Sequence, residues 1–158
     1  MILGTDCMRE NIIDIIAYLM AELHSNHAIN EKTVATLSNQ GYSQSEISTA
    51  FSWLADRASM QEFTSVAKEG SQYSFRILHD FEKMFVSSEV FGYLLLLQQL
   101  GVLAHGQLEE VIERCIATGQ QPIELSEVKE IIAALLFSTD PYSAPGRRIF
   151  LHPTDMIH

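Results

Sequence analysis

Histidine is the residue type with the widest chemistry in this chain, because imidazole binds metals and transfers protons near neutral pH. The sequence contains six histidines, and His24 and His27 are three residues apart at the expected end of a helix, where they could form half of a metal site. Zinc takes three or four protein ligands, and no cysteine or carboxylate cluster with ligand spacing accompanies the pair. An imidazole that interacts with a helix C-terminus is the simpler interpretation. We predict no metal site and no cofactor.

The sequence lacks the patterns that are typical of a catalytic centre. It contains no Gly-x-Ser-x-Gly elbow, no phosphate-binding glycine loop and no dinucleotide fingerprint. The carboxylates of Glu109, Glu110 and Glu113 fall on the outer side or the edge of their expected helix, which is typical of a solvated face or an acidic docking surface. We predict that the protein is not an enzyme and has no catalytic residues.

Arg76 is the one cation in the apolar segment that runs from Tyr73 to Leu78. An arginine in such a place often pairs bidentately with a carboxylate and thereby joins two elements. Asp80 and Glu82 are the local candidates, and an acid of the third or the sixth expected helix is the distant one. We predict a structural bridge that involves Arg76 and Glu82 and holds two lobes together.

The charge balance is strongly acidic, with 20 Asp and Glu against 10 Lys and Arg and a formal net charge of -10. Such a surface repels phosphate backbones and anionic lipids at long range, so it disfavours nucleic-acid and membrane binding. The two cysteines, Cys7 and Cys115, are too few for a disulfide framework and favour a reducing compartment. The first residues include no basic leader, and no apolar stretch is long enough to span a bilayer. We expect a cytoplasmic protein.

The N-terminal part of the chain predicts three helices. Apolar residues at three-to-four spacing give one wide apolar face to a first helix over about residues 10–24. Asn30 is a typical N-cap for a short second helix, and Gly41 follows that helix where a left-handed residue is favoured. Ser43 and Glu46 have the spacing of a capping box, which opens a third helix.

Residues 91–100 contain four consecutive leucines, which leave a helix without a polar face. The segment is too short to cross a bilayer, which takes about 20 apolar residues. We therefore predict that it is the buried central helix of a C-terminal lobe and the most buried element of the protein.

The pattern divides the chain into four segments. Residues 1–58 are expected to form the N-terminal three-helix lobe, and residues 79–137 the C-terminal helical lobe. Residues 59–78 break the helical period and form either a short β-hairpin or an irregular link. Residues 138–158 contain Pro141 and Pro145 and are expected to be an extended or mobile tail. The predicted fold is mainly α, with six or seven helices.

The N-terminal lobe fits two functions. In a helix-turn-helix unit, the third helix would enter a DNA major groove, with a hairpin as its wing. Residues 33–56 contain no Lys or Arg, however, and phosphate contacts supply much of the affinity of such units. In a compact adaptor, similar in pattern to ubiquitin-associated domains, Gly41, Tyr42 and Trp53 would contact a partner, since aromatic residues are common interface anchors. For each of these residues alone, a structural role is the simpler interpretation: Tyr42 would pack on the first helix, and Gly41 would cap the end of the second.

Three blocks of the chain resemble a known family. They are Leu37-x3-Gly41-Tyr42-x4-Ile47-x2-Ala50-x2-Trp53-Leu54, then Ser74-x-Arg76 followed by Glu82, then Gly92 to Arg114 followed by an apolar helix around Lys129. In order and spacing these blocks resemble the bacterial Smg family over roughly residues 10–137. The chain departs from the family pattern at Gln98, where an acid often stands, and at Glu130, where a tryptophan often stands. The resemblance implies an uncharacterised protein, and the genes of the family often lie near genes for DNA processing.

Together these observations favour a small acidic protein of the cytoplasm that binds a protein partner and has no catalytic activity. The alternative is a winged-helix or helix-turn-helix protein associated with nucleic acid and linked to DNA processing, which the net charge disfavours. The sequence identifies neither the partner nor the oligomeric state.

Overall fold

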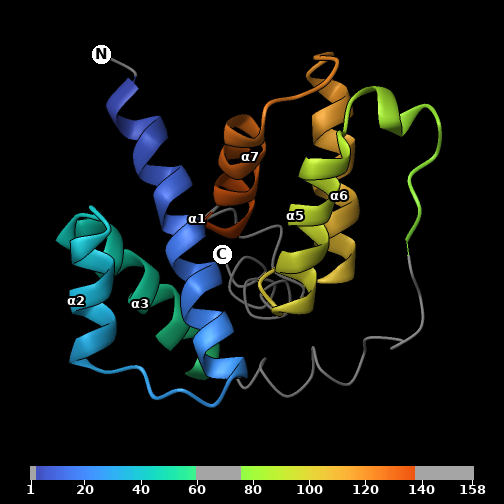
Figure 1. Ribbon diagram of the computed structural model, residues 1–158. Coiled ribbons are helices and arrows are strands. Elements are labelled where there is room, and N and C mark those ends of the chain that lie inside the picture. The colour runs from blue at the N-terminus through green and yellow to red at the C-terminus, as the bar shows by residue number, and fades with distance from the viewer. Residues whose placement is uncertain (1–2, 60–75, 138–158) are drawn as a thin grey trace, which may run out of the picture.

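The computed structural model describes residues 3–59 and 76–137 of the 158-residue chain. These residues form six α-helices and one short 3-10 helix, and they contain no strand, so the prediction of a mainly α fold is confirmed (Figure 1). The elements are α1 (Leu3–His24), α2 (Glu31–Asn39), α3 (Gln44–Ser59), η1 (Glu82–Met84), α5 (Ser88–Gln99), α6 (His105–Ala117) and α7 (Leu125–Phe137).

The short-range signals at the helix ends are found in the structure. The Asn30 side chain accepts a hydrogen bond from the backbone N–H of Lys32 at 2.9 Å and caps α2. Gly41 has a φ of +98°, a conformation that glycine adopts without the steric cost of a side chain. The Ser43 hydroxyl and the Glu46 carboxylate form the predicted capping box at the start of α3. α1 begins at Leu3, earlier than the predicted residue 10.

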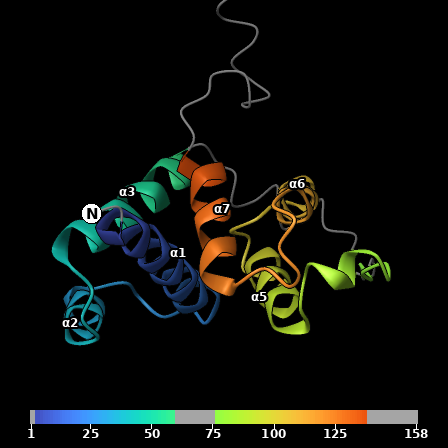
Figure 2. The ribbon, with the colours of Figure 1, turned by 90° about the horizontal axis from the view of Figure 1, so that it is seen from above.

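α1 is the central element of the described fold. It packs on α3 on one side and on α7 on the other, and α5 and α6 cover the far side of α7 (Figure 2). Within α1, no residue from 10 to 22 is exposed, and Ile13, Ile15, Ile16 and Leu19 are fully buried. A helix placed between two others needs apolar residues on two faces, which explains the density of isoleucine in α1.

The prediction that the leucine-rich helix is the most buried element is therefore wrong. α5 buries Val90, Leu94 and Leu97, but Leu96 is 46% exposed and Gly92 is exposed as well. The reason is that α5 packs mainly against α6 and α7, and the described residues leave the opposite stripe of the helix without a covering helix. Four successive leucine side chains point to all sides of a helix. One of them is therefore exposed wherever one side of the helix has no other element packed against it.

Two predicted segments fall outside the described residues. The predicted hairpin over 59–78 lies mostly in residues 60–75, and residues 76–78, which are described, form no strand. The predicted tail over 138–158 lies outside the described residues entirely, and the division of the chain into lobes stays a prediction. No helix in residues 3–59 or 76–137 is both long enough and apolar enough to span a membrane.

Candidate functional site

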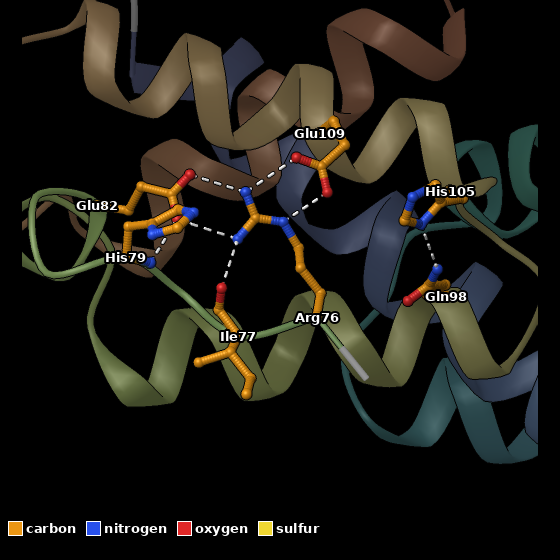
Figure 3. Close-up of polar contacts among 7 residues, drawn as sticks. All are labelled: Arg76, Ile77, His79, Glu82, Gln98, His105 and Glu109. Atoms are coloured by element: carbon orange, nitrogen blue, oxygen red, sulfur yellow. Dashed lines mark hydrogen bonds and ion pairs between the residues drawn. The ribbon is translucent and has the colours of Figure 1, made fainter. Parts of the chain in front are cut away.

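The guanidinium of Arg76 lies between two carboxylates, Glu82 of η1 and Glu109 of α6 (Figure 3). It donates to both oxygens of Glu82, at 2.7 and 3.1 Å, and to both oxygens of Glu109, of which the Nη2–Oε2 distance is 2.9 Å. Glu82 also accepts a hydrogen bond from the backbone N–H of His79 at 2.8 Å. The contact joins the segment before η1 to α6, which is 33 residues away in the sequence.

These ion pairs are shielded enough to fix the charge states of the groups. The side chains of Arg76 and Glu82 are both 15% exposed, and that of Glu109 is 37% exposed. Hydrogen bonds from Arg76 lower the pKa of Glu82 to about 2, against the opposing effect of burial. The same two carboxylates raise the pKa of Arg76. One cation faces two anions here, so the cluster carries a net charge of -1.

The lowered pKa predicts how stability depends on pH when Glu82 is replaced by glutamine. A carboxyl group whose pKa is lower in the folded than in the unfolded state stabilises fully above its ordinary value of 4.5, and loses that effect as the pH falls through about 2. The free energy of unfolding of wild type should therefore exceed that of Glu82→Gln by about 1–3 kcal/mol at neutral pH. Denaturant titrations should show this difference shrinking between pH 5 and pH 2.

Glu113, an exposed residue of α6, supplies the matched control for that experiment. Glu113→Gln should change the free energy of unfolding by less than about 0.5 kcal/mol at neutral pH. A pH profile for Glu82→Gln that runs parallel to the wild-type profile would show that the Arg76 pair does not stabilise the fold.

A groove of about 500 Å³ opens beside Arg76, between residues 76–78 and the first two turns of α5. Ile77, Lys83, Phe91 and Gly92 are among its lining residues. Ile77 is 77% exposed. Met84 of η1 is 51% exposed, and Phe81, which precedes η1, is 61% exposed. Leu96 lies one helical turn beyond Gly92 on the uncovered stripe of α5. We refer to Ile77, Phe81, Met84, Gly92 and Leu96 as the α5 face.

Gly92 is an unusual residue for the interior of α5. Glycine costs a helix about 1 kcal/mol relative to alanine, because it has more backbone freedom to lose on folding. Apart from its chain neighbours and the backbone of α5 itself, no atom of the described residues lies within 4 Å of the place where a Cβ would be at Gly92. Within that part of the chain, no close contact explains why the position lacks a side chain.

A second polar cluster, at the meeting of α1, α5 and α7, has no counterpart among the predicted site residues. The Asp14 carboxylate accepts hydrogen bonds from the Tyr93 hydroxyl at 3.0 Å and from Lys129 Nζ at 2.9 Å. Lys129 also lies 5.4 Å from the centre of the Tyr93 ring. The sequence offers one signal for this cluster: Asp14 and Lys129 are opposite charges that each interrupt an apolar helix face. The Asp14 carboxylate and the Lys129 ammonium group form an ion pair with each other.

The residues predicted to bind a partner are placed apart from the α5 face. Tyr42 is half-buried and packs against the hydrophobic core, and burial, followed by the nearby Asp14 carboxylate, raises the pKa of its phenol. Trp53 is also half-buried, with the Arg57 guanidinium 4.9 Å from its ring. Gly41 forms the turn between α2 and α3. A partner role for Gly41, Tyr42 and Trp53 stays a prediction.

The two histidines considered as half of a metal site face different partners. The His24 ring lies 3.2 Å from the carbonyl oxygen of Leu100, and the His27 ring lies 3.2 Å from the Glu22 carboxylate. Elsewhere, the His105 ring lies 3.4 Å from the Gln98 amide and links the end of α5 to the start of α6 (Figure 3). In residues 3–59 and 76–137, no three His, Cys, Asp or Glu side chains are grouped so that they could hold a metal ion.

Comparison with known proteins identifies relatives over almost the whole chain. A family model described as "Protein of unknown function (DUF494)" matches residues 12–149. A protein named "Protein Smg homolog" from Stenotrophomonas maltophilia (strain K279a) is 30% identical over 159 residues, which cover 96% of this chain and 100% of the relative. A protein of the same name from Xanthomonas oryzae pv. oryzae (strain PXO99A) is 31% identical with the same coverage. No solved structure matches the chain.

Proposed function

The chain belongs to the Smg family, whose biochemical function is unknown, and from its own surface we propose that it is a small acidic adaptor that binds other proteins. In this proposal the protein works in the cytoplasm and has no catalytic activity. The interaction surface is the α5 face, rather than the turn between α2 and α3.

The observation that carries this proposal is the clustering of exposed apolar side chains. Five large apolar side chains are exposed in the described residues, and four of them, Ile77, Phe81, Met84 and Leu96, belong to a stretch of 20 residues. The fifth is Leu23, at the end of α1, with 38% exposure. Ile77 also lines the groove beside α5, and exposed apolar residues that lie close together are typical of protein interaction sites.

The state of the polar clusters supports a role without catalysis. A general acid or base must keep a hydrogen-bonding position free for its substrate. Here both Glu82 oxygens bind Arg76, and Asp14 binds both Tyr93 and Lys129. Such pairing is suited to holding helices in place.

Direct binding of nucleic acid is the function that the surface supports less well. α2, α3 and the turn between them carry Lys32 and Arg57 as their only Lys or Arg residues, one at each end. Arg57 donates a hydrogen bond to the carbonyl oxygen of Val102 at 3.1 Å, so part of its guanidinium already has a partner within the fold. Glu46, at the start of α3, is buried and accepts hydrogen bonds from Asn11 and from the backbone N–H of Ser43. Its negative charge partly cancels the positive end of the helix dipole that would attract a phosphate.

Affinity capture from a lysate tests the adaptor proposal. Tagged wild-type protein should retain a protein partner after nuclease treatment, and Ile77→Asp and Met84→Asp should each reduce that capture about tenfold or more, as loss of an interface anchor does. Both side chains are more than half exposed, so neither change should unfold the protein. Bound proteins are quantified by mass spectrometry.

Leu23→Asp is the matched control, because Leu23 is an exposed apolar residue outside the α5 face. It should leave capture unchanged. Capture that survives Ile77→Asp and Met84→Asp would remove the α5 face from the proposal. A partner recovered only from lysate without nuclease would indicate binding through nucleic acid.

A further inference from the structure

Gly92 lies where a close approach to α5 is possible from outside the molecule. It sits on the uncovered stripe of the helix and lines the groove that Ile77 and Phe91 also line. The position where its Cβ would be faces open space among the described residues. A glycine on a helix surface permits another backbone to come nearer than any residue with a side chain would allow.

The charges around the groove favour a basic occupant. Arg76 and Lys83 are the charged residues that line the groove, and they contribute two positive charges. Glu82, Glu109 and Asp80 pair with these cations and Glu89 follows the lining residue Ser88, so the six charges together give a net charge of -2. Lys83 lies 3.0 Å from Asp80, and Arg76 is already paired with two carboxylates. The cations at the groove are therefore compensated within the protein, and the surplus is negative.

The α5 face also has residues at the spacing that a docked helix would contact. Gly92 and Leu96 are four residues apart on one stripe of α5, and the apolar groups of η1 and Ile77 flank the start of that helix. An amphipathic helix can lay its apolar side on such a surface and place its charged side at the rim. Its backbone would pass closest to α5 at Gly92.

We propose that the α5 face binds a basic amphipathic helix of a protein partner, which packs across α5 at Gly92. This inference rests on the adaptor function proposed above, and it specifies the chemistry of the partner: leucine-like side chains on one side and Lys or Arg on the other. Gly92 is the position that sets how closely the two helices approach.

Gly92→Ala separates this proposal from a structural role of the glycine. Because alanine fits the helix without a clash, the variant should melt about 2–4 °C higher than wild type. The added methyl group should hold the partner helix away and weaken its binding about tenfold. Higher stability combined with weaker binding is the expected signature.

The probe is a synthetic helical peptide of leucine and lysine with one apolar stripe, labelled for fluorescence anisotropy and titrated with the full chain at about 150 mM salt. A twin peptide with glutamate in place of lysine should bind about tenfold more weakly or not at all. Gly106→Ala is the control variant, since Gly106 is an exposed glycine of α6 with equally open space around it. It should bind the lysine peptide as wild type does.

Equal binding of the two peptides, or unchanged binding by Gly92→Ala, would overturn the inference. A dimer of this chain that dissociates on Gly92→Ala would assign the face to a second copy and would also overturn it. If the lysine peptide does not bind, but lysate capture still depends on Ile77 and Met84, the adaptor function stands and only the basic helix is rejected. If capture is also independent of Ile77 and Met84, the proposed function fails as well.

Discussion

Replacement of Ile16 by alanine is expected to lower the free energy of unfolding by about 2–5 kcal/mol. Ile16 is fully buried in α1, between α3 and α7, so the change removes apolar contacts and leaves a cavity at the centre of the core. Urea unfolding followed by circular dichroism measures this loss.

Leu96→Ala is the comparison that makes the experiment decisive. Leu96 belongs to the run of four leucines, but it is 46% exposed, and its truncation should change the free energy of unfolding by about 0.5 kcal/mol or less. A larger loss for Leu96→Ala than for Ile16→Ala would mean that α5, and not α1, is the centre of the core.

Arg76→Ala is expected to cost about 2–4 kcal/mol, because it leaves the carboxylates of Glu82 and Glu109 without their shared cation. This loss of stability is smaller than that expected for a fully buried ion pair, because Glu109 is partly exposed to solvent. The melting temperature should fall by about 5–15 °C. Adding Glu82→Gln to the Arg76→Ala variant should recover part of this loss, since it removes one of the two uncompensated charges.

Arg114→Ala serves as the control for that experiment. Arg114 pairs with Glu110 on the same helix, but these side chains are 46% and 44% exposed, so the change should cost about 0.5 kcal/mol or less. An Arg76→Ala variant that melts like wild type but no longer captures a partner would show that Arg76 acts in binding and not in the fold.

Features of the structure that depend on neighbouring residues could be predicted from the sequence. Asn30, Gly41 and the pair Ser43 and Glu46 act over two to five residues, and the structure places each where its type predicts. The contact between Arg76 and Glu82 spans six residues and belongs to the same class. Such features depend on backbone geometry that a short sequence already determines.

Features that depend on distant segments could be predicted only in part. An acid of the sixth expected helix is a candidate partner of Arg76, and Glu109 of α6 binds it. Asp14 meets Tyr93 across 79 residues and Lys129 across 115 residues, and no local pattern specifies these pairings. The same limit explains the error over α5: an apolar run reveals that a helix needs cover, but the covering helix and the uncovered side follow from the packing of the whole chain. The exposure of Ile77, Phe81 and Met84 likewise follows from where the chain around η1 lies in the fold, which no local pattern specifies.

The packing of the first helix against the last has a consequence for how the chain is made. During synthesis α1 and α3 can associate early, because only a short segment separates them. The other side of α1 receives its partner only when residues 125–137 have left the ribosome, at the end of the described chain. Until then the isoleucine-rich face of α1 lacks its α7 cover, and exposed apolar surface of this kind promotes aggregation. We therefore expect chains that stop before α7 to aggregate more readily than the full chain, because one face of α1 lacks its partner helix.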